Sequence, residues 1–164
     1  MADVRNVAAF FIDLAQKQNE MDAGDLMTNL RLQKLLYFAQ GWHLARYGKP
    51  LFNAPLAAWK HGPVVPELYY HYKKFGSQGI VTSDAVPEDA FTSKEYELLL
   101  DVAQAYAPYS TGELVSMSHQ PDAPWSHTAQ SGEIPRQAIQ AYFSKQEPLP
   151  SFDDLLDGYP VEVL

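Results

Sequence analysis

A helix that is apolar on most of its circumference constrains this chain more than any other feature. Residues 30–47 read Leu-Arg-Leu-Gln-Lys-Leu-Leu-Tyr-Phe-Ala-Gln-Gly-Trp-His-Leu-Ala-Arg-Tyr. Thr28 can cap its start, and Gly48 and Pro50 follow as stop signals. A helix with so little polar surface is packed by several neighbours, so we expect it at the centre of the fold. Its buried polar residues are costly unless each finds a hydrogen-bond partner.

Further helices are expected before and after this central one in the sequence. Asp3 suits the N-cap of a helix over about residues 4–18. Capping boxes, Thr92 with Glu95 and Ser110 with Glu113, indicate two more. Proline near a helix start favours three others, near residues 66–75, 122–132 and from 135 onward. The expected fold class is mainly α, a single helical domain of about six or seven helices.

A small two-stranded β element is expected near residues 51–60. Residues 50–65 show no helical period, and two short apolar runs stand within them. Leu51-Phe52 and Leu56 to Trp59 are the two expected strands, joined by a turn at Asn53-Ala54-Pro55.

The length of 164 residues fits one domain. Pro148 and Pro150 divide the chain into a helical domain over residues 1–148 and an acidic C-terminal tail over 149–164. The tail contains several apolar side chains, so it either docks on the domain or binds a partner.

The sequence contains no cysteine, so disulfides, cysteine-ligated zinc and thiol catalysis are excluded. The chain shows neither a signal peptide nor an apolar run of membrane-spanning length, so a cytoplasmic location with no membrane partner is expected.

The formal charge of −8 is unevenly distributed along the chain. Residues 1–83 hold 9 basic and 6 acidic side chains, whereas residues 84–164 hold 3 basic and 14 acidic ones. The acidic second half repels phosphate backbones, which argues against a nucleic-acid partner. A basic surface on a partner protein is the better match for that half, unless its acids serve only solubility.

The residues offer few candidates for catalysis or metal binding. His119, Asp122 and His127 are close in sequence, but their spacing matches no standard zinc motif. No G-x-S-x-G elbow or glycine-rich phosphate loop is present. We therefore expect no enzyme, cofactor or metal. The alternative is a hydrolase or metal-dependent enzyme with a site near His61, His119 and Asp122, which requires their loops to converge.

A protein-binding surface is the better candidate site. Trp59, Lys60 and His61 precede a Gly-Pro turn, and Tyr69 and Tyr72 lie three residues apart on one expected helix. Tyrosine and tryptophan favour protein interfaces because they combine apolar area with a polar group. We therefore expect these five residues to bind a partner. The structural alternative is that Lys60 covers Trp59, His61 bonds a turn carbonyl, and the tyrosines edge the core.

Several blocks of this sequence match a long and specific pattern of residues. The pattern L-Q-K-L-L-Y-F-A-Q, then W-H, is present at Leu32–Gln40 and Trp42-His43. Y-G-x-P-L-F and A-W-x-x-G-P-V-V-P follow at Tyr47–Phe52 and Ala58–Pro66. Together with a later element at Ser118-His119 and Pro124-Trp125, these blocks resemble the SocA-like, Panacea-domain family of antitoxins. The likeness extends over about residues 4–145.

This resemblance implies a mostly helical protein that binds and neutralises a toxin protein, usually the product of a neighbouring gene. In the best-known case the antitoxin also acts as a proteolytic adaptor that delivers its toxin to the ClpXP protease. Related domains also occur in phage-associated proteins. The resemblance assigns no role to the acidic tail.

Overall fold

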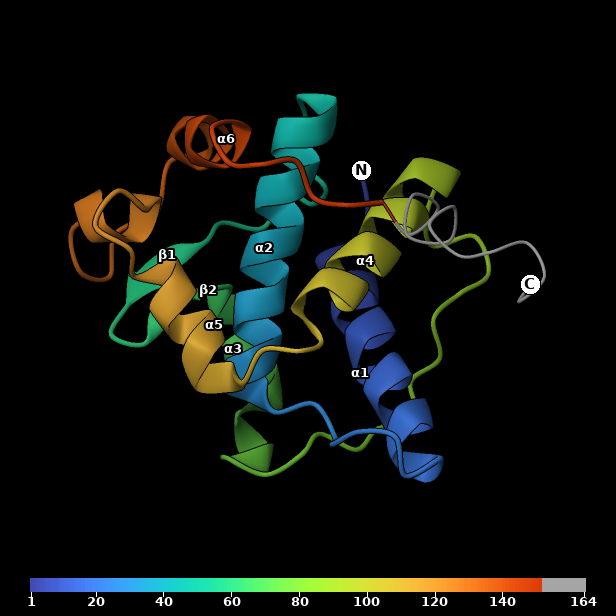
Figure 1. Cartoon of the computed structure of the whole chain (residues 1–164). Coiled ribbons are helices and arrows are strands. Elements are labelled where there is room, and N and C mark those ends of the chain that lie inside the picture. The colour runs from blue at the N-terminus through green and yellow to red at the C-terminus, as the bar shows by residue number, and fades with distance from the viewer. Residues whose placement is uncertain (152–164) are drawn as a thin grey trace.

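Helix α2 (Asn29–Tyr47) runs through the centre of the fold (Figure 1). The structure, a computed structural model, describes residues 1–151. In Figure 1, α1 (Val4–Glu20) and α4 (Ser93–Tyr106) lie on one side of α2. The strands, α5 (Thr111–Ser118) and α6 (Arg136–Ser144) lie on the other. The mainly α fold class is confirmed. The prediction that the tail docks on the domain or binds a partner concerns residues 152–164, which lie outside the described residues.

The burial of α2 confirms its predicted central position. Every residue from 32 to 44 is buried. The Thr28 side chain accepts a hydrogen bond from the Arg31 amide at the start of the helix, and Gly48 ends it in a left-handed conformation. Helix α6 approaches α2 so closely that a Cβ built on Gly41 would lie 2.2 Å from the Phe143 ring. The absence of a side chain at residue 41 therefore sets the distance between these two helices.

Buried polar side chains of α2 fix the segment that follows it. The Gln40 side chain accepts from the Leu51 amide at 2.8 Å and donates to the Phe52 carbonyl at 2.9 Å. Gln33 accepts from the Val65 amide at 2.8 Å. These bonds take up polar groups that would be costly to bury alone, so α2 determines the path of residues 49–65.

The two-stranded sheet is present, but its strands differ from those expected. β1 (Ala57–Trp59) pairs antiparallel with β2 (Gly62–Val64), not with Leu51-Phe52. Residues 51 and 52 are instead engaged by Gln40 and by Ala2, whose amide donates to the Leu51 carbonyl. Pro63 is tolerated in β2 because Ala58, its partner, directs its amide and carbonyl toward Gly132 and Ser131. The missing proline N–H therefore removes no ladder bond.

The remaining helices follow the predicted start signals. Both capping boxes form, Thr92 with Glu95 on α4 and Ser110 with Glu113 on α5. The expected third helix is an α-helix that tightens into a 3₁₀ turn before Gly76, and the expected sixth is a single 3₁₀ turn. These elements are α3 (Pro66–Tyr72), η1 (Lys73–Phe75) and η2 (Pro124–His127).

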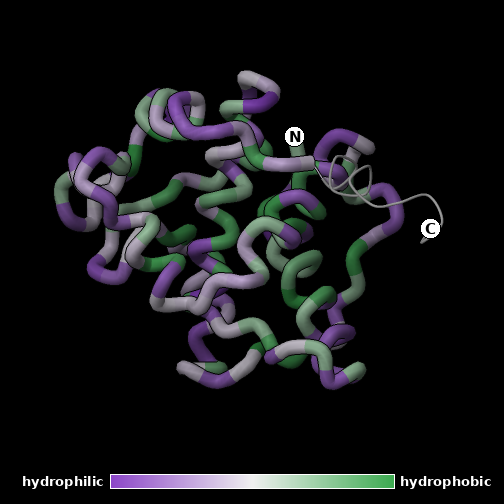
Figure 2. The backbone as a smooth tube through the Cα atoms, viewed as in Figure 1, coloured by the Kyte–Doolittle hydropathy of each residue, from purple (hydrophilic) through white to green (hydrophobic). Residues whose placement is uncertain are grey.

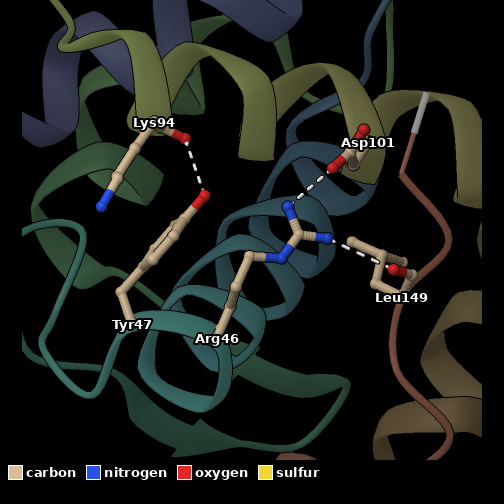
Figure 3. Close-up of polar contacts among 5 residues, drawn as sticks. All are labelled: Arg46, Tyr47, Lys94, Asp101 and Leu149. Atoms are coloured by element: carbon tan, nitrogen blue, oxygen red, sulfur yellow. Dashed lines mark hydrogen bonds and ion pairs between the residues drawn. The ribbon is translucent and has the colours of Figure 1, made fainter. Parts of the chain in front are cut away.

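The C-terminal end of α2 is joined to α4 and to the end of the described chain (Figure 3). Arg46 forms an ion pair with the fully buried Asp101 side chain at 2.6 Å and donates to the Leu149 carbonyl at 3.2 Å. Tyr47 donates to the Lys94 carbonyl at 3.4 Å. These contacts, together with the burial of Leu149, attach residue 149 to the domain.

Apolar residues concentrate in the interior, and much of the outer chain is hydrophilic (Figure 2). No helix in residues 1–151 combines the length and apolar character that crossing a membrane requires.

Candidate functional surface

The tight turn between β1 and β2 presents Lys60 and His61 to solvent and is fixed from below. Gly62 has a φ of 111°, which disfavours any residue with a side chain. A Cβ there would lie 2.8 Å from Ser118 Oγ and 3.0 Å from Lys34 Nζ. Beneath it the fully buried Lys34 donates to the Pro63 carbonyl at 2.5 Å, and burial lowers its pKa to about 7. The turn is therefore attached directly to the central helix.

A cluster of three aromatic rings lies beside this turn. The Trp59 ring contacts Tyr69 and Tyr70 of α3 edge to face, with ring centroids 5.0 and 5.9 Å apart. Tyr69 and Tyr70 contact each other at 5.5 Å. A hydrogen bond also fixes the Trp59 backbone, because its carbonyl oxygen accepts from the Trp125 indole N–H at 2.7 Å. The rings thus form one preorganised patch, which is what a protein-binding surface requires.

The structure brings together four of the five predicted partner-binding residues and separates the fifth. Tyr72 is only 5% exposed, whereas Tyr70 is 61% exposed. The prediction placed Tyr69 and Tyr72 on one helix face from their spacing of three residues. It did not take account of Leu68, which is fully buried. A residue four positions after a buried leucine shares its helix face, so Leu68 was the signal that places Tyr72 inside and leaves Tyr70 outside.

Two exposed lysines belong to the same part of the chain as the ring cluster. Lys60 follows Trp59 in the turn, and Lys73 Nζ lies 5.9 Å from the centroid of the Tyr70 ring. Glu67, the acidic residue of α3, is engaged by Arg5 at 3.2 Å. We call the set of Trp59, Lys60, His61, Tyr69, Tyr70 and Lys73 the aromatic–basic surface.

Two residues of the alternative enzyme site, His119 and Asp122, have different surroundings in the described chain. His119 stacks on Trp125 with ring centroids 3.7 Å apart, and its buried Nε2 has no hydrogen-bond partner. Burial lowers the pKa of His119, and the charges of Lys34 and His61 add to this. Asp122 lines a separate cavity of about 250 Å³ beside Tyr142. Within residues 1–151, no three His, Asp or Glu side chains are placed to hold a metal ion.

A groove of about 660 Å³ on another part of the molecule is a second candidate surface, which the sequence did not indicate. It lies between α1, the loop before α4, and α4 itself. Its apolar and aromatic lining includes Phe10, Leu14, Phe91 and Tyr96. Lys17 and Asp13 form an ion pair at its edge, at 2.8 Å. The lining holds two acidic residues, Asp13 and Glu88, and one basic residue, Lys17, so it lacks the basic character of the aromatic–basic surface and serves below as a comparison surface.

Comparison with known proteins supports the resemblance seen in the sequence. The family described as "Antitoxin SocA-like, Panacea domain" matches residues 32–126, which contain the whole aromatic–basic surface. The chain is 33% identical over 135 residues to the Antitoxin SocA of Caulobacter vibrioides, covering 75% of this chain and 68% of that protein. No solved structure matches the chain. The chain therefore belongs to the SocA-like, Panacea-domain antitoxin family.

Proposed function

We propose that this protein is an antitoxin that binds and neutralises a toxin protein encoded by a neighbouring gene. The observation that carries this proposal is the 33% identity to Antitoxin SocA over 75% of the chain. The aromatic–basic surface is the proposed binding site. An interface of standard size covers about 800 Å² on each partner, and tryptophan and tyrosine often supply much of its binding energy.

The aromatic–basic surface supports neutralisation by binding. The rings of Trp59, Tyr69 and Tyr70 are already in contact before a partner arrives, so little side-chain entropy is lost on association. A toxin covered by this surface loses access to its own target. We place this binding in the cytoplasm, where the toxin is synthesised.

We also propose a finer form of the activity, in which the protein acts as an adaptor to the ClpXP protease. Binding alone leaves the toxin intact, whereas delivery shortens its lifetime. The half-life of the toxin, measured with and without this protein in cells that have or lack ClpXP, separates the two. Protein-dependent degradation that requires ClpXP supports the adaptor, and an unchanged half-life with restored growth leaves neutralisation by binding.

The test of the antitoxin activity is growth. A bacterial culture expresses the neighbouring gene alone or together with this protein. Growth arrest by the neighbour and recovery on co-expression are expected. A toxic neighbour whose arrest is not relieved by this protein would contradict the proposal.

The place of the binding site is tested with paired tyrosine variants. Tyr69→Ala with Tyr70→Ala removes two rings of the aromatic–basic surface, and Tyr96→Ala removes an exposed ring from the comparison groove. We expect the double variant to lose roughly 2 kcal/mol or more of toxin-binding free energy, and Tyr96→Ala to lose little. If both variants are folded and lose the same toxin-binding free energy, the toxin-binding site is not the aromatic–basic surface.

A further inference from the structure

We propose that the aromatic–basic surface recognises an acidic segment of its protein partner, although the chain as a whole is acidic. This inference rests on the proposed function and names the chemistry of the partner. It depends on the local charge around the rings of Trp59, Tyr69 and Tyr70, which has the opposite sign to the net charge of −8.

The local charge is positive because the lysines here lack acidic partners. Lys60, Lys73 and Lys74 are all exposed, and within residues 1–151 none of them forms an ion pair. Glu67, which would offset one of them, already has Arg5 as its partner at 3.2 Å. An acidic segment seated on the rings would meet the Lys73 ammonium group at Tyr70, and Lys60 in the turn next to Trp59 is also free to engage it.

The arrangement of the lysines favours a segment that is both acidic and apolar. Lys73 Nζ lies over the Tyr70 ring, 5.9 Å from its centroid, and Lys60 follows directly after Trp59. Apolar side chains of the partner would pack on the rings, and carboxylates would reach the lysines at the rim. Rim charges of this kind mainly set the association rate and the choice of partner.

Nucleic acid is the other polyanion that such lysines attract. The acidic second half of the chain, with 3 basic and 14 acidic side chains, repels a long phosphate backbone. A short acidic protein segment avoids that repulsion because it need contact only the aromatic–basic surface. The observations therefore favour a protein segment.

The test compares two charge-reversal variants of equal net charge. Lys60→Glu with Lys73→Glu reverses the proposed surface, and Lys49→Glu with Lys145→Glu reverses two exposed lysines elsewhere. Each substitution changes the charge by −2, so both variants go from −8 to −12. Any difference between them reports the position of the charge rather than its total. Circular dichroism of both variants establishes that they remain folded.

The first probe is the toxin from the neighbouring gene, titrated at about 50 mM and about 300 mM salt. We expect reversal at residues 60 and 73 to weaken binding by roughly tenfold or more at low salt, less at high salt, and the matched control to change it by no more than about twofold. Equal effects of the two variants would overturn the inference while leaving the antitoxin proposal intact.

A second probe makes the test independent of the toxin. A labelled peptide of alternating glutamate and phenylalanine is titrated by fluorescence polarisation, beside a labelled single-stranded oligonucleotide. Peptide binding that is lost only in the variant reversed at residues 60 and 73 supports the inference. Two results would contradict the inference that the surface recognises an acidic protein segment. In one, the wild-type protein binds the oligonucleotide at these lysines instead of the peptide, and in the other it binds neither the peptide nor the toxin.

Discussion

Lys34 Nζ lies 2.5 Å from the carbonyl oxygen of Pro63, and this hydrogen bond joins the central helix to the turn that presents the candidate surface. The ammonium group is fully buried, and its one direct acceptor in the described chain is that carbonyl. The same helix bonds Val65 through Gln33, one residue before Lys34. The core and the candidate surface are therefore coupled through adjacent side chains of α2.

Lys34→Met is expected to remove a pH dependence of stability. Burial lowers the pKa of Lys34 from 10.5 to about 7, so between these values the unfolded chain binds one more proton than the native state. The contribution of Lys34 to the free energy of unfolding therefore rises with pH across that window, by at most about 1.4 kcal/mol per pH unit. Below about pH 7 this contribution reaches its lowest value.

The measurement is urea denaturation of wild type and Lys34→Met at several pH values between about 6 and 10. Other titrating groups are common to both proteins and cancel in the difference. The free energy of unfolding of wild type minus that of the variant should increase as pH rises. A difference that stays constant across the range would show that Lys34 keeps its ordinary pKa in the fold.

Gly62→Ala is expected to disturb the turn that carries Lys60 and His61. The added Cβ would meet Ser118 and Lys34 and would have to adopt a φ of 111°, so we expect a loss of about 2–3 kcal/mol of stability. Gly48→Ala is the matched control, because residue 48 has a φ of 71° and open space around it. It should lose only about 1 kcal/mol, so equal shifts of the two variants in thermal denaturation would argue against crowding at the turn.

Arg46→Leu is expected to destabilise the contact between α2 and α4. The Asp101 side chain is fully buried, so the substitution removes an ion pair from a carboxylate that water does not reach (Figure 3). We expect a loss of about 3 kcal/mol in chemical denaturation. If the ion pair is the main role of Asp101, the double variant with Asp101→Leu should recover part of this, because both buried charges are then removed together. A double variant less stable than the single one would show that Asp101 acts chiefly through other contacts.

Removing residues 152–164 is expected to leave the fold intact. Leu149 is buried and its carbonyl accepts from Arg46, so this cut keeps the last contacts seen in the described chain. We expect the thermal midpoint and the neutralising activity to remain near those of the full chain. This outcome would support a helical domain that functions without its acidic tail, and loss of neutralisation by a folded truncated protein would assign the tail a role in binding.

The sequence predicted the helices well because their signals are local. The Thr92–Glu95 and Ser110–Glu113 boxes and the apolar character of α2 each depend on residues within a few positions of one another. The pairing of β1 with β2 could not be predicted in this way. It requires that Gln40, eleven residues before Leu51, engages residues 51 and 52 and removes them from the sheet.

The candidate surface was predicted in part for the same reason. Trp59, Lys60 and His61 are adjacent in sequence. Trp59 ends β1 and is half-buried, and the exposure of Lys60 and His61 in the tight turn follows from Gly62 and Pro63. The choice between Tyr70 and Tyr72 depended on which face of α3 meets the core, and Leu68 decides that face. The lysines at 60 and 73 become neighbours of one ring cluster only through the contact between Trp59 and Tyr70.

Hydrogen–deuterium exchange of this protein, alone and saturated with the toxin from the neighbouring gene, tests the central claim most directly. Residues 57–75, which include the β1–β2 turn and α3, should gain protection on binding. The comparison groove at Phe10, Phe91 and Tyr96 should exchange at an unchanged rate. Protection confined to that groove, or none anywhere in the presence of excess toxin, would contradict the account.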